Sequence, residues 1–210
     1  MRTISALGAA LVGALALGFA GAPAGAQSLK VVALGTSFTA GNFVTNDEIW
    51  TAKLQQLLAT RGEPVQVVNA GVAGETTRNL LARMDHAVPE GTTVAILEYS
   101  VVNDDHGGIS FKETVANVEK MALRLLARAR PPQVVIFIRG RNDKDLQRNQ
   151  ASFQAFIYEK HLSYVVAMSD YWGPGLHPSA QSHAHYAELL APVVGELLAH
   201  AREASATSRQ

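Results

Sequence analysis

Five short apolar runs alternate along this chain with longer stretches whose apolar residues recur at helical spacing. The runs predict strands at residues 29–34, 65–69, 93–99, 133–138 and 163–168. Strands that are this continuously apolar are buried on both faces, which requires a parallel sheet with helices on each side. Because crossovers between parallel strands are right-handed, the pattern predicts the α/β class. The expected fold is a three-layer α/β/α sandwich around a flavodoxin-like, doubly wound five-stranded parallel sheet.

The stretches between these runs predict the covering helices, because their apolar residues fall on one face. The expected helices are residues 50–60, 76–88, 110–130, 150–161 and 180–201. Residues 139–149 (RGRNDKDLQRN) follow the fourth strand and are expected to form a charged loop. Residues 202–210 are expected to form a polar C-terminal tail.

The first 26 residues are predicted to lie outside this domain. Arg2 precedes an uncharged stretch that reaches Ser28 and contains Ala24-Gly25-Ala26. A positive start, an apolar middle and an A-x-A site are typical of a secretory signal peptide. We expect cleavage after Ala26, so that residues 27–201 form one exported domain in the periplasm or the medium, without a stable membrane anchor. The alternative is an uncleaved anchor helix, because the stretch is long enough to span a bilayer.

The composition excludes several kinds of site. The chain contains no cysteine, and 18 basic side chains balance 18 acidic ones. The lack of cysteine excludes a disulfide scaffold, a thiolate zinc site, an iron–sulfur cluster and a cysteine nucleophile. A formal charge of zero gives no support for a nucleic-acid partner, because such partners require a basic surface.

Polar residues follow the predicted strands at the edge where parallel sheets bind ligands. Ser37 follows the first strand, Gly71 the second, Asn103 the third and His177 the fifth. A serine hydroxyl can attack a carbonyl carbon while a histidine takes its proton. Amide donors can stabilise the oxyanion that forms. The four loops therefore contain the components of an acyl-transfer site.

These blocks resemble the SGNH (GDSL-type) hydrolase family, especially its small secreted thioesterase, arylesterase and lysophospholipase-like members. The resemblance runs from Gly35-Thr36-Ser37 through residues 69–85 (NAGVAGETTRNLLARMD) to Gly175-Leu176-His177-Pro178. It implies the SGNH hydrolase fold and a serine esterase that hydrolyses small acyl esters or thioesters without metal or cofactor. By this resemblance Ser37 is the nucleophile and His177 the base. The oxyanion hole is formed by the Ser37 and Gly71 amides and the Asn103 side chain.

The sequence departs from the family pattern at three positions. Thr36 replaces the usual aspartate of the first block, and we expect its hydroxyl to reach a neighbouring backbone group. Val101 replaces a glycine two residues before Asn103, so the loop that aims Asn103 must differ. Pro174 replaces the aspartate three residues before His177. We therefore expect a slow Ser–His dyad, helped by Asp170 or by a backbone carbonyl of residues 172–175.

Two other functions remain open on the same fold. The three departures favour a degenerate, non-catalytic member that binds an ester or a glycan. A carbohydrate O-deacetylase is the other alternative, because the family includes such enzymes. The sequence leaves the acyl length, the leaving group and the oligomeric state open.

Several polar residues have competing interpretations. The segment Gly140-Arg141-Asn142-Asp143 has the glycine that the family places two residues before its asparagine donor. It follows the fourth strand rather than the third, so Asn103 is preferred over Asn142 as the donor. His183 and His185 lie two residues apart and point to different faces of a helix, which disfavours a metal site with His177. The segment 104–106 is expected to be a solvated turn.

Overall fold

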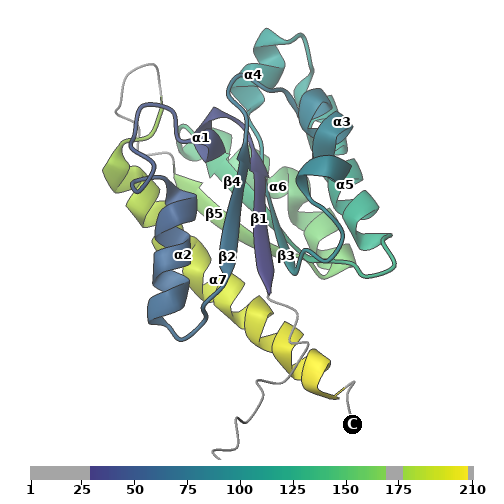
Figure 1. Ribbon diagram of the computed structural model, residues 1–210. Coiled ribbons are helices and arrows are strands. Elements are labelled where there is room, and N and C mark those ends of the chain that lie inside the picture. Colours follow the sequence, from purple (N-terminus) through teal and green to yellow (C-terminus); the bar gives the residue numbers. More distant parts are fainter. Residues whose placement is uncertain (1–28, 169–176, 208–210) are drawn as a thin grey trace, which may run out of the picture.

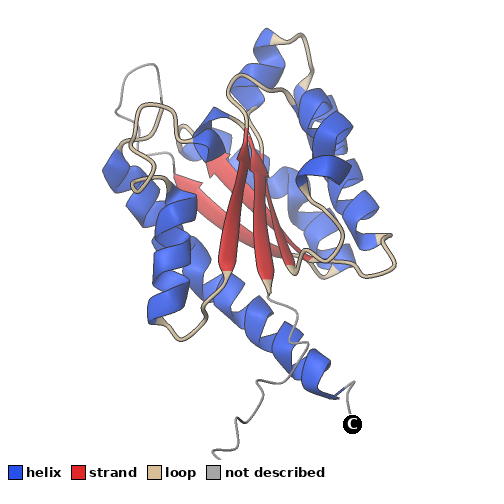
Figure 2. Ribbon diagram, viewed as in Figure 1, coloured by secondary structure: helices blue, strands red, loops and turns tan. Residues whose placement is uncertain are grey.

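A single parallel sheet forms the centre of the protein. The computed structural model describes residues 29–168 and 177–207. The five strands have the order β2-β1-β3-β4-β5 and all pair in parallel. They are β1 (Lys30–Gly35), β2 (Gln66–Gly71), β3 (Val94–Glu98), β4 (Gln133–Gly140) and β5 (Ser163–Met168). Helices cover both faces of this sheet, as Figures 1 and 2 show. The predicted three-layer, doubly wound fold is confirmed.

The two helical layers bury alternate residues of the strands. One layer consists of α2 (Trp50–Thr60) and α7 (Ala180–Thr207), and the other consists of α3 (Thr77–Ala87), α5 (Phe111–Leu126) and α6 (Asp143–Lys160). Val31 and Ala33 face the first layer, whereas Val32 and Leu34 face the second. Because every one of these β1 side chains is fully buried, this interior strand forms a continuous apolar run in the sequence.

Strand order reverses between β1 and β3. The chain leaves β1 to form β2 on one side, then crosses back to form β3 on the other side. In the ladders, Gly35 lies opposite Gly71 and Leu34 lies opposite Leu97. The carboxyl ends of β1 and β3 are therefore the topological switch point, where ligands bind in doubly wound sheets. Two short helices begin there, α1 (Ser37–Ala40) and α4 (Val101–His106), and Figure 1 shows both at this end of the sheet.

The prediction of a charged loop at residues 139–149 is wrong for all but two residues, because β4 includes residues 139 and 140 and α6 includes residues 143–149. Helix α6 begins at Asp143, and the Asn142 side chain caps it by accepting the Asp145 N–H at 2.9 Å. The first turns of α6 are charged because most of their side chains face solvent, while Asn149 turns inward and is buried. A solvent-facing first turn carries no apolar periodicity, so the helix start was hidden in the sequence.

The expected solvated turn at residues 104–106 is also wrong, because Asp104 is fully buried in α4. Its carboxylate accepts the Thr77 N–H at 2.7 Å, the Thr77 hydroxyl at 2.6 Å and the Thr114 hydroxyl at 2.6 Å. Asp104 of α4 thus accepts the N–H of the first residue of α3 and also binds side chains of α3 and α5, which holds the three helices together. Asp105 and His106 are exposed, as expected.

The closing helix α7 continues to Thr207, beyond the expected end at Ala201. Arg202 forms an ion pair with Glu63 there, which holds the extra turn against the body of the domain. Over residues 29–168 and 177–207, no helix is both long enough and apolar enough to cross a membrane. The predicted signal peptide and its cleavage position lie outside the described residues.

Candidate active site

Ser37 is the first residue of α1 and stands directly after the Gly35-Thr36 end of β1. The Ala40 N–H donates to the Thr36 carbonyl at 2.9 Å, so the chain turns sharply from strand to helix at this point. The Ser37 side chain is partly exposed, and its hydroxyl has no hydrogen-bond partner among the described residues. The predicted nucleophile therefore lies at the switch point in a partly exposed position.

A buried carboxylate holds the turn that carries Ser37. Glu98 ends β3 and is fully buried. It accepts the Thr36 N–H at 2.7 Å, the Thr36 hydroxyl at 3.1 Å and the Thr39 hydroxyl at 3.0 Å. The Thr36 hydroxyl thus donates to Glu98 rather than to a neighbouring backbone group, which corrects that expectation. Hydrogen bonds to an ionised group are stronger than neutral ones, so the turn is firmly held.

Arg139 completes the surroundings of Glu98. It forms an ion pair with that carboxylate and donates to the Tyr99 carbonyl at 3.2 Å. Its guanidinium also lies over the Phe38 ring, with Cζ 3.5 Å from the ring centroid. Because Phe38 immediately follows Ser37, this ion pair contacts the nucleophile turn (residues 36–39) on both sides of Ser37, with Glu98 at Thr36 and Arg139 at Phe38.

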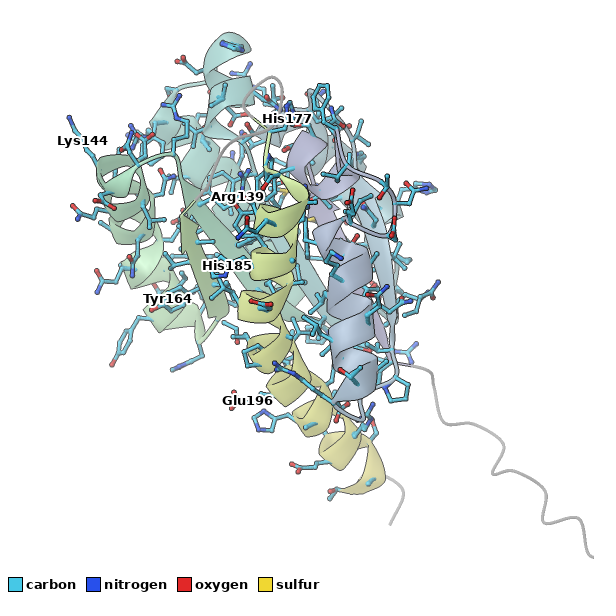
Figure 3. All side chains as sticks on the ribbon, turned by 90° about the vertical axis from the view of Figure 1, so that its left-hand side faces the viewer. Arg139, Lys144, Tyr164, His177, His185 and Glu196 are labelled. Atoms are coloured by element: carbon cyan, nitrogen blue, oxygen red, sulfur yellow. The ribbon has the colours of Figure 1, made fainter. Side chains whose placement is uncertain are left out.

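His177 lies three residues before α7, at the same end of the molecule as the switch point (Figure 3). Its ring packs against Phe43, with centroids 5.0 Å apart, and Phe43 itself has a left-handed backbone (φ 70°). The His177 Nδ1 atom is buried and has no hydrogen-bond partner among the described residues. Asp170 and Pro174, the positions considered for its support, lie outside the described residues.

Gly71 ends β2 and must be a glycine because α1 approaches it closely. A Cβ atom at Gly71 would lie 2.2 Å from the Ala40 nitrogen. The Gly71 N–H donates to the Asn69 side-chain oxygen at 2.9 Å. The Asn69 amide in turn donates to the Thr39 carbonyl at 2.6 Å. The predicted oxyanion donor therefore already has an acceptor in this structure.

Gly74 is a second backbone donor in the same loop. It has a left-handed conformation (φ 78°), and a Cβ atom there would meet nothing within 4 Å. Its N–H has no acceptor among the residues that the structure describes. Gly74 was not predicted as a donor from the sequence; it lies two residues before Thr76, which caps α3.

Asn103 lies inside α4 and faces the same loop. Its side-chain amide donates to the Glu75 carbonyl at 2.9 Å. A side-chain amide has two N–H groups, so one remains for a ligand. Helix α4 begins at Val101, and its Ser100 cap accepts the Asn103 N–H at 3.2 Å. Val101 replaces the family glycine, and here a helix capped by Ser100 positions the Asn103 side chain.

Arg83 ties the loops of this edge to one another. It pairs with Glu75 at 2.6 Å and donates to the carbonyls of Gly35 and Ala70 at 3.1 and 2.9 Å. These contacts join the ends of β1 and β2 to the segment that Asn103 contacts. Asn142, in contrast, uses its side-chain oxygen to cap α6.

Comparison with known proteins decides the family. Residues 33–185 match the model of the GDSL-like lipase/acylhydrolase family, well over half of the chain. The chain belongs to this family. The predicted class, a GDSL-type ester hydrolase, is thereby confirmed.

Two curated relatives and one solved structure illustrate the similarity. The arylesterase of Vibrio mimicus is 28% identical over 200 residues, which cover 89% of this chain and 96% of the arylesterase. The esterase TesA of Pseudomonas aeruginosa is 32% identical over 126 residues, which cover 60% of this chain and 61% of TesA. The crystal structure of TesA superposes with a TM-score of 0.67 at 21% identity, covering 80% of this chain and 99% of that one. This superposition supports the fold.

The two other histidines considered for a metal site in this GDSL-family chain, His183 and His185, lie in different environments. His183 is fully buried, and its Nδ1 accepts the N–H of Trp50, the first residue of α2, at 3.1 Å. Burial, together with the charge of Arg139, lowers the pKa of His183 to about 4. His185 lies on the exposed side of the same helix. Within the described parts of the chain, no three His, Asp or Glu side chains are grouped as metal ligands.

Proposed function

We propose that this protein is a serine esterase that hydrolyses small acyl esters or thioesters through an acyl-enzyme on Ser37. The observation that carries this proposal is the position of Ser37 at the β1–β3 switch point, on a turn that Glu98 and Arg139 hold in place. Family membership and the names of the arylesterase and esterase relatives support the same reaction class.

In the proposed reaction, His177 takes the Ser37 hydroxyl proton as Oγ attacks the carbonyl carbon of the ester. The carbonyl oxygen becomes an oxyanion, and the protonated His177 then gives its proton to the leaving alcohol or thiol. A water molecule then attacks the acyl carbon while His177 takes a proton from it. His177 returns that proton to Ser37 Oγ as the acyl–oxygen bond breaks and the carboxylic acid leaves. No metal or cofactor takes part.

The oxyanion is proposed to accept hydrogen bonds from the Ser37 N–H, the Asn103 side chain and one glycine amide. Gly71 can supply that amide only if its N–H leaves the Asn69 oxygen. The Gly74 N–H is unoccupied by any described residue, which makes it the more accessible alternative in this loop. Each such donor contributes about 10²–10³ in turnover when removed from comparable sites.

We propose that the second imidazole N–H of His177 has only a weak hydrogen-bond acceptor. A carboxylate that accepts the second imidazole N–H fixes the tautomer and stabilises the imidazolium. The buried Nδ1 of His177 finds no such partner among the described residues. We propose a dyad assisted by Asp170 or by a backbone carbonyl of residues 172–175, with correspondingly slow turnover.

The proposal is tested with p-nitrophenyl acetate, butyrate and octanoate and with an acetyl thioester. Wild-type protein should hydrolyse at least one of them, and Ser37→Ala and His177→Ala should each abolish turnover. Labelling of wild-type protein, but not Ser37→Ala, by a fluorophosphonate would identify the nucleophile. A sugar-acetate panel tests carbohydrate O-deacetylation.

The orphaned Nδ1 of His177 favours a second candidate, a non-catalytic member that binds an ester or glycan without turnover. Activity equal to buffer on every substrate, together with no fluorophosphonate labelling, would select this candidate over the esterase. Asp170→Asn separates the forms of support, because unchanged turnover would dismiss Asp170 as the helper of His177.

We also propose that the protein is exported after cleavage at the Ala24-Gly25-Ala26 site. The mass of the protein recovered from the periplasm or medium should correspond to a chain that begins at Gln27. Recovery of the full-length chain from the membrane fraction would instead support the anchor helix.

A further inference from the structure

A hollow lies beside the nucleophile turn, at the carboxyl ends of β3 and β4. It has a volume of about 400 Å³, including the part open to solvent. Tyr99 and Asn149 line its buried side, and Arg139, Arg141 and Arg148 line its walls and rim. The start of α4, which carries Asn103, forms another part of its lining.

Three buried polar atoms from the lining residues lack protein partners. They are the Tyr99 hydroxyl, Nε of Arg139 and the side-chain oxygen of Asn149. The side chains of Tyr99 and Asn149 are only 4% and 3% exposed. Buried polar groups are nearly always hydrogen-bonded, so each exception requires an explanation. All three atoms belong to residues that line one hollow, so a polar ligand or a water molecule that reaches the base of the hollow would satisfy them.

The charge of the lining favours an anion. The lining includes three guanidinium groups and one carboxylate, that of Asp145, which pairs with Arg141 at 3.0 Å and with Arg148 at 3.5 Å. Arg139 pairs with Glu98, which is outside the lining, so one guanidinium charge remains in excess. About half of each of the Arg141 and Arg148 side chains is exposed. Guanidinium forks match the geometry of carboxylate and phosphate oxygens.

The hydroxyl of Tyr99 is suited to donate to such an anion. Burial raises the pKa of Tyr99 above its ordinary range, so the hydroxyl keeps its proton at neutral pH. Arg139 Nε is a second donor. A water molecule can give one proton to the Asn149 oxygen and the other to the anion, which would satisfy all three groups.

The hollow is connected directly to the proposed catalytic turn. Arg139 lies over Phe38, next to Ser37, and pairs with Glu98, which holds Thr36. Figure 3 shows Arg139 within the fold below His177, whereas Lys144 of α6 points away from the body of the protein. A group bound in the hollow would therefore lie close to an ester positioned at Ser37.

We propose that this hollow is a recognition subsite for an anionic group, a carboxylate or a phosphate, carried by the ester substrate. The inference rests on the proposed esterase function and specifies its substrate class. It assigns Tyr99 and Arg139 as donors to the anion and Arg141 and Arg148 as the charges that attract it.

Matched esters test the subsite and separate its possible anions. Phenyl acetate is compared with 4-acetoxybenzoate and 4-acetoxyphenyl phosphate, and p-nitrophenyl butyrate with p-nitrophenyl hemisuccinate. At least one anionic ester should have a kcat/KM about tenfold or more above its neutral match, since charge-assisted hydrogen bonds to the anion are strong. The preference should decline with added salt.

Substitutions of the lining residues test whether the preference for anionic esters comes from the hollow. In Tyr99→Phe and in Arg141→Gln/Arg148→Gln, the ratio of kcat/KM on the anionic ester to that on the neutral ester should fall several-fold. The ratio cancels any general loss of activity. Lys144→Gln removes a charge that points away from the body of the protein on the same helix, and its ratio should match wild type. Equal rates on anionic and neutral esters, or ratios that the lining variants leave unchanged, would overturn the inference.

A binding measurement keeps this test independent of turnover. Calorimetric titration of succinate and of phenyl phosphate into Ser37→Ala should show saturable binding that Arg141→Gln/Arg148→Gln weakens. If neither the neutral nor the anionic esters are hydrolysed but this binding is seen, the esterase proposal fails and the anion site stands. If neutral esters are hydrolysed but no anion binds, the esterase proposal stands and the anion site fails.

Discussion

The Thr36 N–H donates to the Glu98 carboxylate at 2.7 Å, which links the turn before Ser37 to the end of the neighbouring strand β3. These residues are 62 positions apart in the chain. The family aspartate is missing at position 36, and a carboxylate from β3 holds the same turn. Glu98 is therefore a positioning residue for the proposed nucleophile, acting through Thr36 and Thr39.

Glu98→Gln should lower both stability and turnover. The variant keeps the size of the side chain but removes the charge, which leaves Arg139 buried without its ion-pair partner. Breaking a buried pair in this way costs about 3–5 kcal/mol. Unfolding in urea measures the loss, and kcat measured where the variant is fully folded should fall at least about tenfold because the turn loosens.

Glu113→Gln is the control, because Glu113 pairs with Arg78 on the surface. It should leave stability and kcat close to wild type. If folded Glu98→Gln has the same kcat as wild type, Glu98 only stabilises the fold and does not position Ser37.

Thr36→Asp, which restores the family residue, should destabilise this protein. The new carboxylate would lie beside Glu98 in a buried site, where like charges repel strongly. Adding Glu98→Gln should recover part of the loss, so the two substitutions should be coupled in a double-mutant cycle. Additive free energies of unfolding would mean that the two positions do not share one site.

Asn103→Ala should affect turnover, whereas Asn142→Ala should affect stability. Asn103→Ala should lower kcat by about 10²–10³ with little change in KM, as expected for loss of an oxyanion donor. Asn142→Ala should cost about 1 kcal/mol of stability, because it removes the cap of α6. Steady-state kinetics and urea unfolding distinguish the two. If Asn142→Ala lowers kcat more than Asn103→Ala does, the oxyanion donor is in the loop after β4 instead.

Asp104→Asn should cost about 2 kcal/mol of stability, because three donors lose a charged acceptor. It should also reduce kcat, since α4 carries Asn103 next to the affected contacts. The matched control is Asp105→Asn, one residue along the same helix and exposed. If both variants unfold at the same urea concentration as wild type, the buried contacts of Asp104 contribute nothing to stability.

His183 should make the protein less stable in acid. Its pKa is about 4 in the folded protein, against about 6.5 in an unfolded chain. Between these values the unfolded chain binds the proton and the folded protein does not. This contribution to stability is therefore full above pH 6.5 and falls by up to about 1.4 kcal/mol per pH unit toward pH 4.

The unfolding free energies of wild type and His183→Gln at pH 7, 6 and 5 test this prediction. The difference between them should narrow as the pH falls, since glutamine does not titrate. His185→Gln, at an exposed position on the same helix, should keep the wild-type pH dependence. A difference that is constant with pH would show that His183 has the same pKa in both states.

Much of the fold was predictable because its information is local. The strand at residues 163–168 and the helix at residues 50–60 match the structure at both ends. Helix α6 was predicted to begin seven residues too late, because its first turns face solvent and show no apolar period. Helix α4 was missed because its six residues are too few to show one. The positions of Ser37 and Asn103 at one sheet edge followed from strand order, but their hydrogen-bond partners did not.

The sequence by itself determined the order of strands and helices, the parallel sheet and the four loops that meet at its edge. It did so because buried parallel strands and amphipathic helices leave periodic patterns in contiguous residues. Only the tertiary structure decided that Glu98 holds the Ser37 turn, that Asp104 is buried, and that the Gly71 amide is already occupied. Whether a polar group is solvated, paired or orphaned depends on donors that folding brings from distant parts of the chain, and no local pattern records them.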